Sequence, residues 1–273
     1  MRINTNVSAM TTLRYLNQAT DAKSSALTKL SSGSRINSAA DDAAGLAVSE
    51  KMKAQIGGLE QAKSNAQDGV SLIQTAEGAM SQSQTILDRM RDLAVQSATG
   101  TLTDQDRGAI NDEFGQLQSE LTRISNVTTF NDKKLLTGGS NGTAFTFQVG
   151  ANAGDTLSVK IAGVSSTDLG VNSADITTAS GASSAITTIN KAITMVSADR
   201  ATLGSVQNRL NYAISNLETS DENLSEANSR IRDVDMAQEM TQFTKSNILT
   251  QAATSMLAQA NAMPNSVLTL LQG

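Results

Sequence analysis

The side chains that perform most enzyme chemistry are scarce in this chain, and two of the most versatile are missing. The sequence contains neither cysteine nor histidine. This excludes cysteine nucleophiles, Ser-His triads, zinc sites built on thiolate or imidazole, and imidazole general bases. It also excludes disulfides, so packing alone must stabilise the fold. The reactions that remain are those that carboxylates can catalyse.

Asp41 and Asp42 are an adjacent pair of carboxylates, and a catalytic acid–base pair is one interpretation of them. The other interpretation is structural. The segment Ser38-Ala39-Ala40-Asp41 has the pattern of a capping box, which predicts that a helix begins near Ala39. Acidic residues at a helix N-terminus also complement the helix dipole. A carboxylate-based hydrolase stays open as a hypothesis, although the Ser/Thr/Asn-rich surroundings do not indicate a pocket.

The C-terminal methionines offer a third kind of chemistry. They belong to an irregular helical stripe of apolar residues, namely Met236, Met240, Phe243, Leu249, Met256, Leu257, Ala260 and Met263. Such a cluster could bind a metal or form an adaptable groove. At helical spacing the simpler interpretation is a packing surface. Pro264 comes next and predicts that the stripe is interrupted there.

The composition favours long helices and argues against several partners. The net charge is −5 and the pI about 4.8, so the chain lacks the basic stripe that nucleic acid binding needs. Aromatic residues make up 3% of the chain, and Pro264 is its one proline. No stretch approaches the ~18 consecutive apolar residues of a membrane span, so we expect no membrane insertion. The N-terminus lacks the apolar run of a secretory signal. We expect no cofactor, no metal and no enzymatic activity.

A strict seven-residue period of apolar residues dominates the last third of the chain. Its members are Ile189, Val196, Leu203, Leu210, Leu217, Leu224 and Ile231. This period gives one long helix a straight apolar seam that other helices must cover.

A second seven-residue series can supply that cover. It consists of Leu59, Ala66, Ile73, Met80, Leu87 and Ala94. The companion positions hold polar residues, among them Lys63, Glu77, Gln84 and Arg91, so this seam is weaker. Glycines also interrupt it, at Gly57, Gly58, Gly69 and Gly78. Each glycine either permits the close approach of a neighbouring backbone or is tolerated at a cost of ~1 kcal/mol.

A third helix and a small β region lie between the two seams. Thr103 and Asp106 form another capping-box pattern, and the apolar residues that follow at helical spacing are Ile110, Phe114, Leu117, Leu121 and Ile124. This helix should end near Asn126. Period-two alternation around a turn-rich Gly150–Asp155 then predicts a β-hairpin within about 127–162. Small polar residues predict an exposed loop over about 163–184.

We therefore predict a mainly α fold, an elongated rod of long antiparallel coiled-coil-like helices with a small β-hairpin region mid-chain. Residues 1–32 and 240–273 form terminal helical arms, 33–43 a linker, and 44–239 the rod. The arms carry apolar positions that belong to no obvious core, including Ile3, Val7, Met10, Leu257, Leu268 and Leu271. Exposed apolar stripes of this kind mark interaction surfaces, and contacts that do not close give filaments.

Several stretches at both ends of the chain closely resemble bacterial flagellin. They are Ile3-Asn4-Thr5-Asn6, the run from Leu30 to Gly45 (LSSGSRINSAADDAAG), Leu93-Ala94-Val95-Gln96-Ser97, Phe147-Gln148-Val149-Gly150-Ala151-Asn152 and Gln259-Ala260-Asn261. With few residues between Gly139 and Ala185, the chain resembles a short, core-only form of that family.

The resemblance implies a structural subunit that polymerises with itself into the extracellular flagellar filament used for swimming motility. In the family, the arms form an inner tube and the rod helices an outer tube. It further implies secretion through the flagellar export apparatus without a cleaved signal peptide, with an export chaperone on the C-terminal arm. The filament cap and hook-junction proteins are the other partners expected from the family.

Innate immune recognition is also implied by the resemblance. A vertebrate Toll-like receptor of the flagellin-sensing type recognises a helix surface of the family, and the matching positions here are Arg89, Leu93 and Glu113. Asp88 stands where the family often has glutamine. The alternative is that Arg89 and Glu113 are solvated helix charges and Leu93 packs inside. For the whole chain, the alternative function is a soluble coiled-coil adaptor or secretion-apparatus tip protein.

Overall fold

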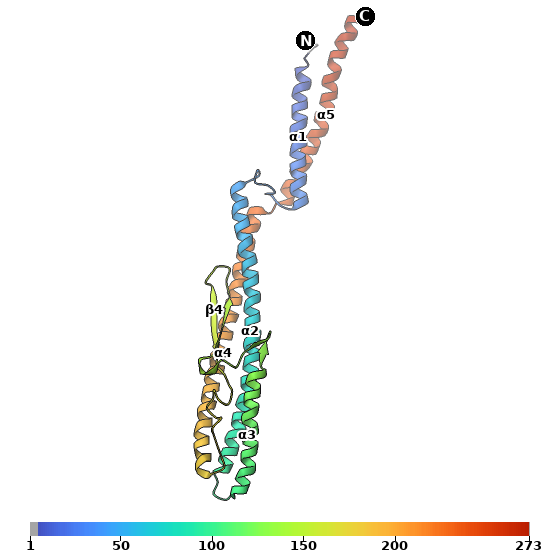
Figure 1. The fold of residues 1–273 in the computed structure, drawn as a ribbon. Helices are drawn as coiled ribbons and strands as arrows, with labels where there is room; N and C mark the ends of the chain where they lie inside the picture. The colour runs from blue at the N-terminus through green and yellow to red at the C-terminus, as the bar shows by residue number, and fades with distance from the viewer. Residues whose placement is uncertain (1–4, 273) are drawn as a thin grey trace. The chain divides into compact units, whose positions relative to one another are not determined.

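The computed structural model describes residues 5–272, apart from the side chains of residue 140 and residues 264–272 (Figure 1). The helices are α1 (Val7–Ser32), α2 (Ala43–Ser97), α3 (Asp104–Val127), the short 3-10 helix η1 (Gly139–Asn141), α4 (Ala179–Arg232) and α5 (Met236–Gln272). The strands are β1 (Thr129–Phe130), β2 (Lys133–Lys134), β3 (Thr143–Gln148) and β4 (Thr156–Ile161). This confirms the predicted class, mainly α with a small β region.

The chain forms two compact units. The terminal unit comprises Met1–Ala54 and Asn223–Gly273, and the central unit comprises Gln55–Glu222. The long helices α2 and α4 each contribute to both. These boundaries differ from the predicted ones, which assigned only residues 1–32 and 240–273 to the arms.

In the terminal unit, α1 and α5 pack side by side and antiparallel (Figure 1). Near the start of α1, the side-chain amide of Asn6 donates to the carbonyl oxygen of Ala260 (2.8 Å). Two-thirds of the way along, the Lys23 ammonium donates to Asn247 Oδ1 (2.9 Å). These two polar contacts, at different heights along the pair, fix the register of the helices.

The predicted interruption at Pro264 is wrong, because α5 runs through it to Gln272. Proline has no N–H, so it leaves the carbonyl four residues earlier without its helical partner. That carbonyl belongs to Ala260, and Asn6 donates to it. At the same time Asn6 Oδ1 accepts from Ala9 N (3.1 Å) and caps α1. One amide therefore serves both helices.

The two connections between the arms and the rest of the chain are paired with each other. Gly33 ends α1 in the left-handed conformation (φ 70°), as glycine does at a helix C-terminus. Arg35 N donates to the carbonyl of Arg232 (2.6 Å), and Val234 N donates to that of Gly33 (3.1 Å). Asp235 then caps α5 through Ala237 N (2.9 Å). The second connection is thus residues 233–235, a few residues earlier than the predicted boundary at 240.

In the central unit, the two predicted seams meet. Ala66, Ile73, Met80, Leu87 and Ala94 of α2 lie in one buried cluster with Ile189, Val196, Leu203 and Leu210 of α4. Leu217 is also buried, whereas Leu224 and Ile231, which belong to the terminal unit, are half-buried. The polar companion positions bond across the seam. Lys63 pairs with Glu218 (2.7 Å), and Arg200 reaches Gln84 (2.6 Å) and Glu77 (3.4 Å).

The third helix and the hairpin are as predicted. Thr103 and Asp106 form the capping box of α3, and Phe114 and Leu121 are buried. Strands β3 and β4 pair antiparallel with Phe145 opposite Val159. A second, shorter pair, β1 and β2, turns through Asn131 and Asp132 at positive φ.

The close packing of the hairpin explains two of the four glycines that interrupt the seam of α2. A Cβ on Gly58 would lie 2.9 Å from the Cβ of Ala151, and one on Gly69 would lie 3.1 Å from the Phe147 ring. A Cβ on Gly57 or Gly78 would meet nothing within 4 Å. Gly58 and Gly69 therefore permit close approach, whereas Gly57 and Gly78 are simply tolerated by the fold of this chain.

The predicted exposed loop over 163–184 is wrong. Its last residues begin α4, and Val164, Val171 and Ile176 are fully buried in the core. The apolar residues are few and without period, so the sequence pattern did not reveal their burial. Hydrogen bonds from individual side chains to the backbone fix this segment instead. Gln118 donates to the carbonyls of Val171 (2.7 Å) and Ala174 (3.2 Å).

Candidate interaction surfaces

The carboxylate pair that could have been catalytic has a structural role. Asp41 accepts hydrogen bonds from the backbone N–H groups of Asn37 (3.1 Å) and Ser38 (2.9 Å) and from the Ser38 hydroxyl. These bonds, led by the Ser38 backbone, lower the pKa of Asp41 below its ordinary value, whereas a general acid needs a raised one. Asp42 accepts from Gly45 N (2.9 Å) at the start of α2. Helix α2 begins at Ala43 rather than near Ala39 because the first carboxylate closes a turn before the second caps the helix.

The terminal unit has almost no apolar interior. Its fully buried apolar residues, among those described, are Ala19, Ala26, Ile36 and Ala260. Its large apolar side chains lie outside: Val7, Met10, Leu13, Tyr15, Leu27, Val48, Met236, Met240, Ile248, Leu249, Met256 and Met263 are each more than 40% exposed. We call this set the apolar arm surface. In the central unit the proportion is reversed, because most large apolar residues are buried there.

Part of the apolar arm surface is hollowed. A groove of about 390 Å³ runs between α1 and α5, and its lining includes Tyr15, Ala19, Leu249, Ala253 and Met256. Small alanines at the helix contact leave this space, while the larger side chains stand at its edges. Isolated exposed apolar residues are common in proteins, but Tyr15, Leu249 and Met256 line one groove on the paired helices, and such a grouping indicates a protein contact.

The structure places the predicted arm residues only in part. Val7 is 66% and Met10 63% exposed, and Leu257 is half-buried. Ile3 and the side chains of Leu268 and Leu271 lie outside the described residues. The sequence missed Tyr15 and Ile248 as surface residues. Their exposure could not be assigned before the packing of α1 against α5 was known.

The residues predicted to meet a receptor are split between surface and core. Arg89 on α2 and Glu113 on α3 are exposed and form an ion pair through Arg89 Nε (2.9 Å) and one terminal nitrogen (2.8 Å). Leu93 is 2% exposed and packs in the core. The side chain of Leu93 therefore lies beneath this surface rather than on it, whereas Arg89 and Glu113 lie on it.

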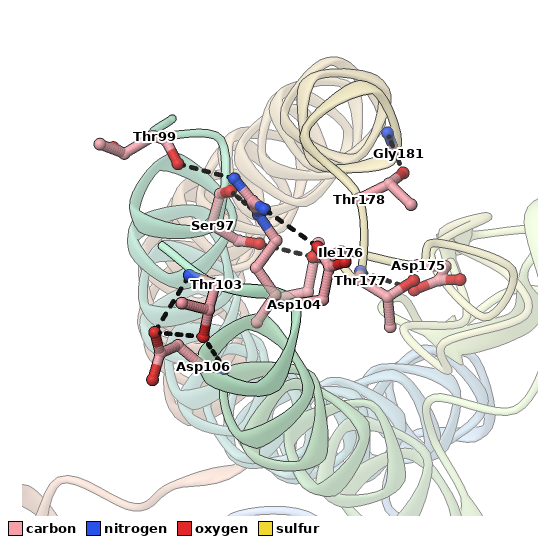
Figure 2. Close-up of polar contacts among 11 residues, drawn as sticks. Ser97, Thr99, Thr103, Asp104, Asp106, Asp175, Ile176, Thr177, Thr178 and Gly181 are labelled. Carbon is pink, nitrogen blue, oxygen red and sulfur yellow. Dashed lines mark hydrogen bonds and ion pairs between the residues drawn. The ribbon is translucent and has the colours of Figure 1, made fainter. Parts of the chain in front are cut away.

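A buried arginine sets the spacing between α2 and α3. Arg107 Nε donates to the carbonyl of Ser97 (2.9 Å), and a terminal nitrogen donates to that of Thr99 (2.8 Å). Its positive charge lies at the C-terminus of α2, where the helix dipole is negative. Figure 2 shows these contacts together with the capping box of Thr103 and Asp106.

The same corner anchors the start of α4. Ser97 Oγ donates to the carbonyl of Ile176 (2.5 Å; Figure 2). Asn111 Oδ1 accepts from Ile176 N (3.3 Å). Sequence reasoning missed Arg107 and Ser97. The available signal was the position of Arg107, one turn after Thr103, whose capping box begins α3, and close in sequence to the end of α2.

No helix among residues 5–272 is long and apolar enough to span a membrane.

Two family models match the chain. The bacterial flagellin N-terminal helical region matches residues 3–141, and the bacterial flagellin C-terminal helical region matches residues 186–271. The segment from 142 to 185 between them, which holds β3, β4 and the buried segment before α4, lies outside both models, as do residues 1–2 and 272–273.

Known flagellins are similar over the whole chain. A flagellin of Halalkalibacterium halodurans is 51% identical over 276 residues, and one of Bacillus subtilis is 46% identical over 304 residues, with all of each chain covered. The crystal structure of Bacillus cereus flagellin is 32% identical, with a TM-score of 0.51 over 56% of this chain and 88% of that one. The chain therefore belongs to the bacterial flagellin family, and it is a structural subunit of the extracellular flagellar filament.

Proposed function

We propose that this flagellin polymerises chiefly through its apolar arm surface, with the central unit acting as a rod that folds on its own. The observation that carries the proposal is the burial pattern of the terminal unit, where the buried apolar residues among those described are three alanines and Ile36 while most large apolar side chains are exposed. Burial of a large apolar side chain contributes about 1.5–3 kcal/mol. Contact between the arms of neighbouring subunits would supply the burial that the single chain lacks.

Leu249 offers a direct test, since it is 49% exposed and borders the groove between α1 and α5. Leu249→Asp should abolish polymerisation on filament seeds while leaving helix content unchanged, because a charge would be buried without a partner. Leu249→Met, which keeps size and polarity, is the matched control. Normal filament growth by the Asp variant would contradict the proposal. Sedimentation and circular dichroism supply the two measurements.

The proposed route to the outside is the flagellar export apparatus, without cleavage of a signal peptide. The C-terminal arm, about residues 235–273, exposes apolar side chains along α5 that need cover before assembly. An export chaperone that binds this arm would provide it. The filament cap and the hook-junction proteins are the further partners that family membership supports. A coiled-coil adaptor or secretion-tip protein is not favoured, because the full-length matches are flagellins.

A Toll-like receptor of the flagellin-sensing type is the proposed host partner of the central unit. The exposed Arg89–Glu113 pair supports this, because its guanidinium and carboxylate lie on adjacent helices and face solvent. Replacement of both by alanine should weaken binding to the receptor ectodomain. The Arg123–Glu120 pair on the same helix α3 (2.6 Å) is a matched control, since it is equally an exposed ion pair. Equal loss from both pairs would contradict the assignment.

A further inference from the structure

Most methionines that the structure describes are either fully buried or more than 40% exposed, and Met52 of α2, which is half-buried, lies between these two groups. Among those that the structure describes, Met80 and Met90 are fully buried in the central unit. Five others lie on α1 and α5 of the terminal unit and belong to the apolar arm surface. They are Met10 (63% exposed), Met236 (50%), Met240 (49%), Met256 (62%) and Met263 (48%). Met195 (42%) is the exposed methionine of the central unit.

Exposure decides how readily a thioether is oxidised. Hydrogen peroxide transfers one oxygen atom to the sulfur. A sulfur lone pair forms the new S–O bond, the O–O bond breaks, and water leaves. The sulfur loses two electrons, and the peroxide is reduced. The product is a sulfoxide, which turns a flexible apolar side chain into a polar one.

We propose that the arm methionines form an oxidation-sensitive site that controls assembly, such that sulfoxide formation on the free subunit blocks its addition to a filament. The inference rests on the proposed function of the apolar arm surface. A sulfoxide oxygen buried between subunits would lack a hydrogen-bond partner, whereas in the free subunit it is solvated. Oxidation therefore penalises the assembled state and leaves the folded monomer intact.

Met256 is the arm methionine whose oxidation should change the apolar arm surface most directly. It lines the α1–α5 groove together with Tyr15 and Leu249, so a polar oxygen there changes the character of the hollow itself. Met80 and Met90 provide an internal reference, because the core of the central unit shields them. A peroxide dose that modifies the arms should leave that core, and the helices around it, unchanged.

The experiment treats folded full-length monomers with hydrogen peroxide and maps the added oxygen by peptide mass spectrometry. We expect the five arm methionines to oxidise at least about tenfold faster than Met80 and Met90. Treated monomers should add to untreated filament seeds several-fold more slowly, and methionine sulfoxide reductases A and B together should restore addition. Unchanged circular dichroism excludes unfolding as the cause.

Variants separate the arm methionines from Met195. For each variant, the measurement is the ratio of treated to untreated addition rates. Replacement of the five arm methionines by leucine should remove the peroxide effect, whereas Met195→Leu should retain it. Should the five-fold variant not assemble, the reductase reversal decides the question. Addition of oxidised wild-type subunits at the untreated rate, or inhibition that the reductases cannot reverse, would overturn the proposal. If untreated wild-type chains fail to polymerise, it is instead the proposed function that fails.

Discussion

At the residue scale, Asn6 performs two tasks that no other neutral side chain of its size combines. Its oxygen caps α1 at Ala9 N, and its nitrogen donates to the Ala260 carbonyl that Pro264 cannot serve. Asn6 and Ala260 are 254 positions apart in the chain. For this reason, no local pattern in the sequence could indicate that the helix survives its proline.

A double-mutant cycle tests this contact between Asn6 and Ala260. Asn6→Asp keeps a capping oxygen but loses the donor, so it should destabilise the α1–α5 pair by about 1 kcal/mol. In a Pro264→Ala background, the new N–H at 264 can serve Ala260, so the same change should cost distinctly less. Denaturant unfolding followed by circular dichroism measures the coupling. If Asn6→Asp lowered the free energy of unfolding equally in both backgrounds, Asn6 and Pro264 would act independently and the assignment would be contradicted.

Asp41 makes the linker sensitive to acid. Its pKa lies below the ordinary value of 3.8, first because of its hydrogen bond from the Ser38 backbone and then because of that from Asn37. A lowered pKa means that the stabilisation is present at pH values above 3.8 and is lost as the pH falls through the folded-state pKa. The Asn37 and Ser38 amides should therefore lose protection from hydrogen exchange in acid, after correction for intrinsic rates.

Asp41→Asn is the reference for that measurement. An amide cannot carry the charge that the two N–H groups favour, so the variant should show weak protection that changes little with pH. A wild-type linker whose protection stays unchanged from pH 7 down through the folded-state pKa of Asp41, located by titrating that carboxyl, would contradict the role assigned to the carboxylate.

At the element scale, periodic signals were reliable and isolated ones were not. The seven-residue periods predicted which faces of α2 and α4 meet, since burial of an apolar stripe leaves a repeating trace in the sequence. The capping box of Thr103 and Asp106 located the start of α3, and alternation located β3 and β4, whereas the similar pattern at Ser38 and Asp41 did not locate the start of α2. The buried segment before α4 left no such trace. Its backbone is held by hydrogen bonds with three side chains, Gln118, Asn111 and Ser97. Because every residue has the same backbone groups, such bonds leave no pattern in the sequence of the segment that they hold.

The packing of the hairpin on α2 supplies a matched pair of glycine substitutions. Gly69→Ala should destabilise the central unit by about 1–3 kcal/mol, because the new Cβ would lie 3.1 Å from Phe147 and 3.3 Å from Leu210. Gly78→Ala, with nothing within 4 Å, should stabilise the helix by about 0.5–1 kcal/mol. Thermal unfolding measures both. A shift of the same sign for the two variants would contradict the close-approach assignment.

At the scale of the whole molecule, the two units divide the work of a filament subunit. The central unit has its own buried core, whereas the terminal unit leaves most of its large apolar residues exposed, and the proposed contacts between subunits would cover them. The sequence indicated this division, because the rod helices carry long seven-residue apolar periods whereas the apolar residues of the arms belong to no such period. It could not give the boundary at 54 and 223, because α2 and α4 pass from one unit to the other without a break.

Negative-stain microscopy of the full chain and of forms without residues 1–32 or 240–273 tests the central claim most directly. The full chain should form long filaments on seeds. Each truncated form should remain monomeric while retaining a cooperative unfolding transition, because the central unit keeps its core. Filaments grown from a truncated form as readily as from the full chain would contradict the account, since assembly would then not depend on the arms.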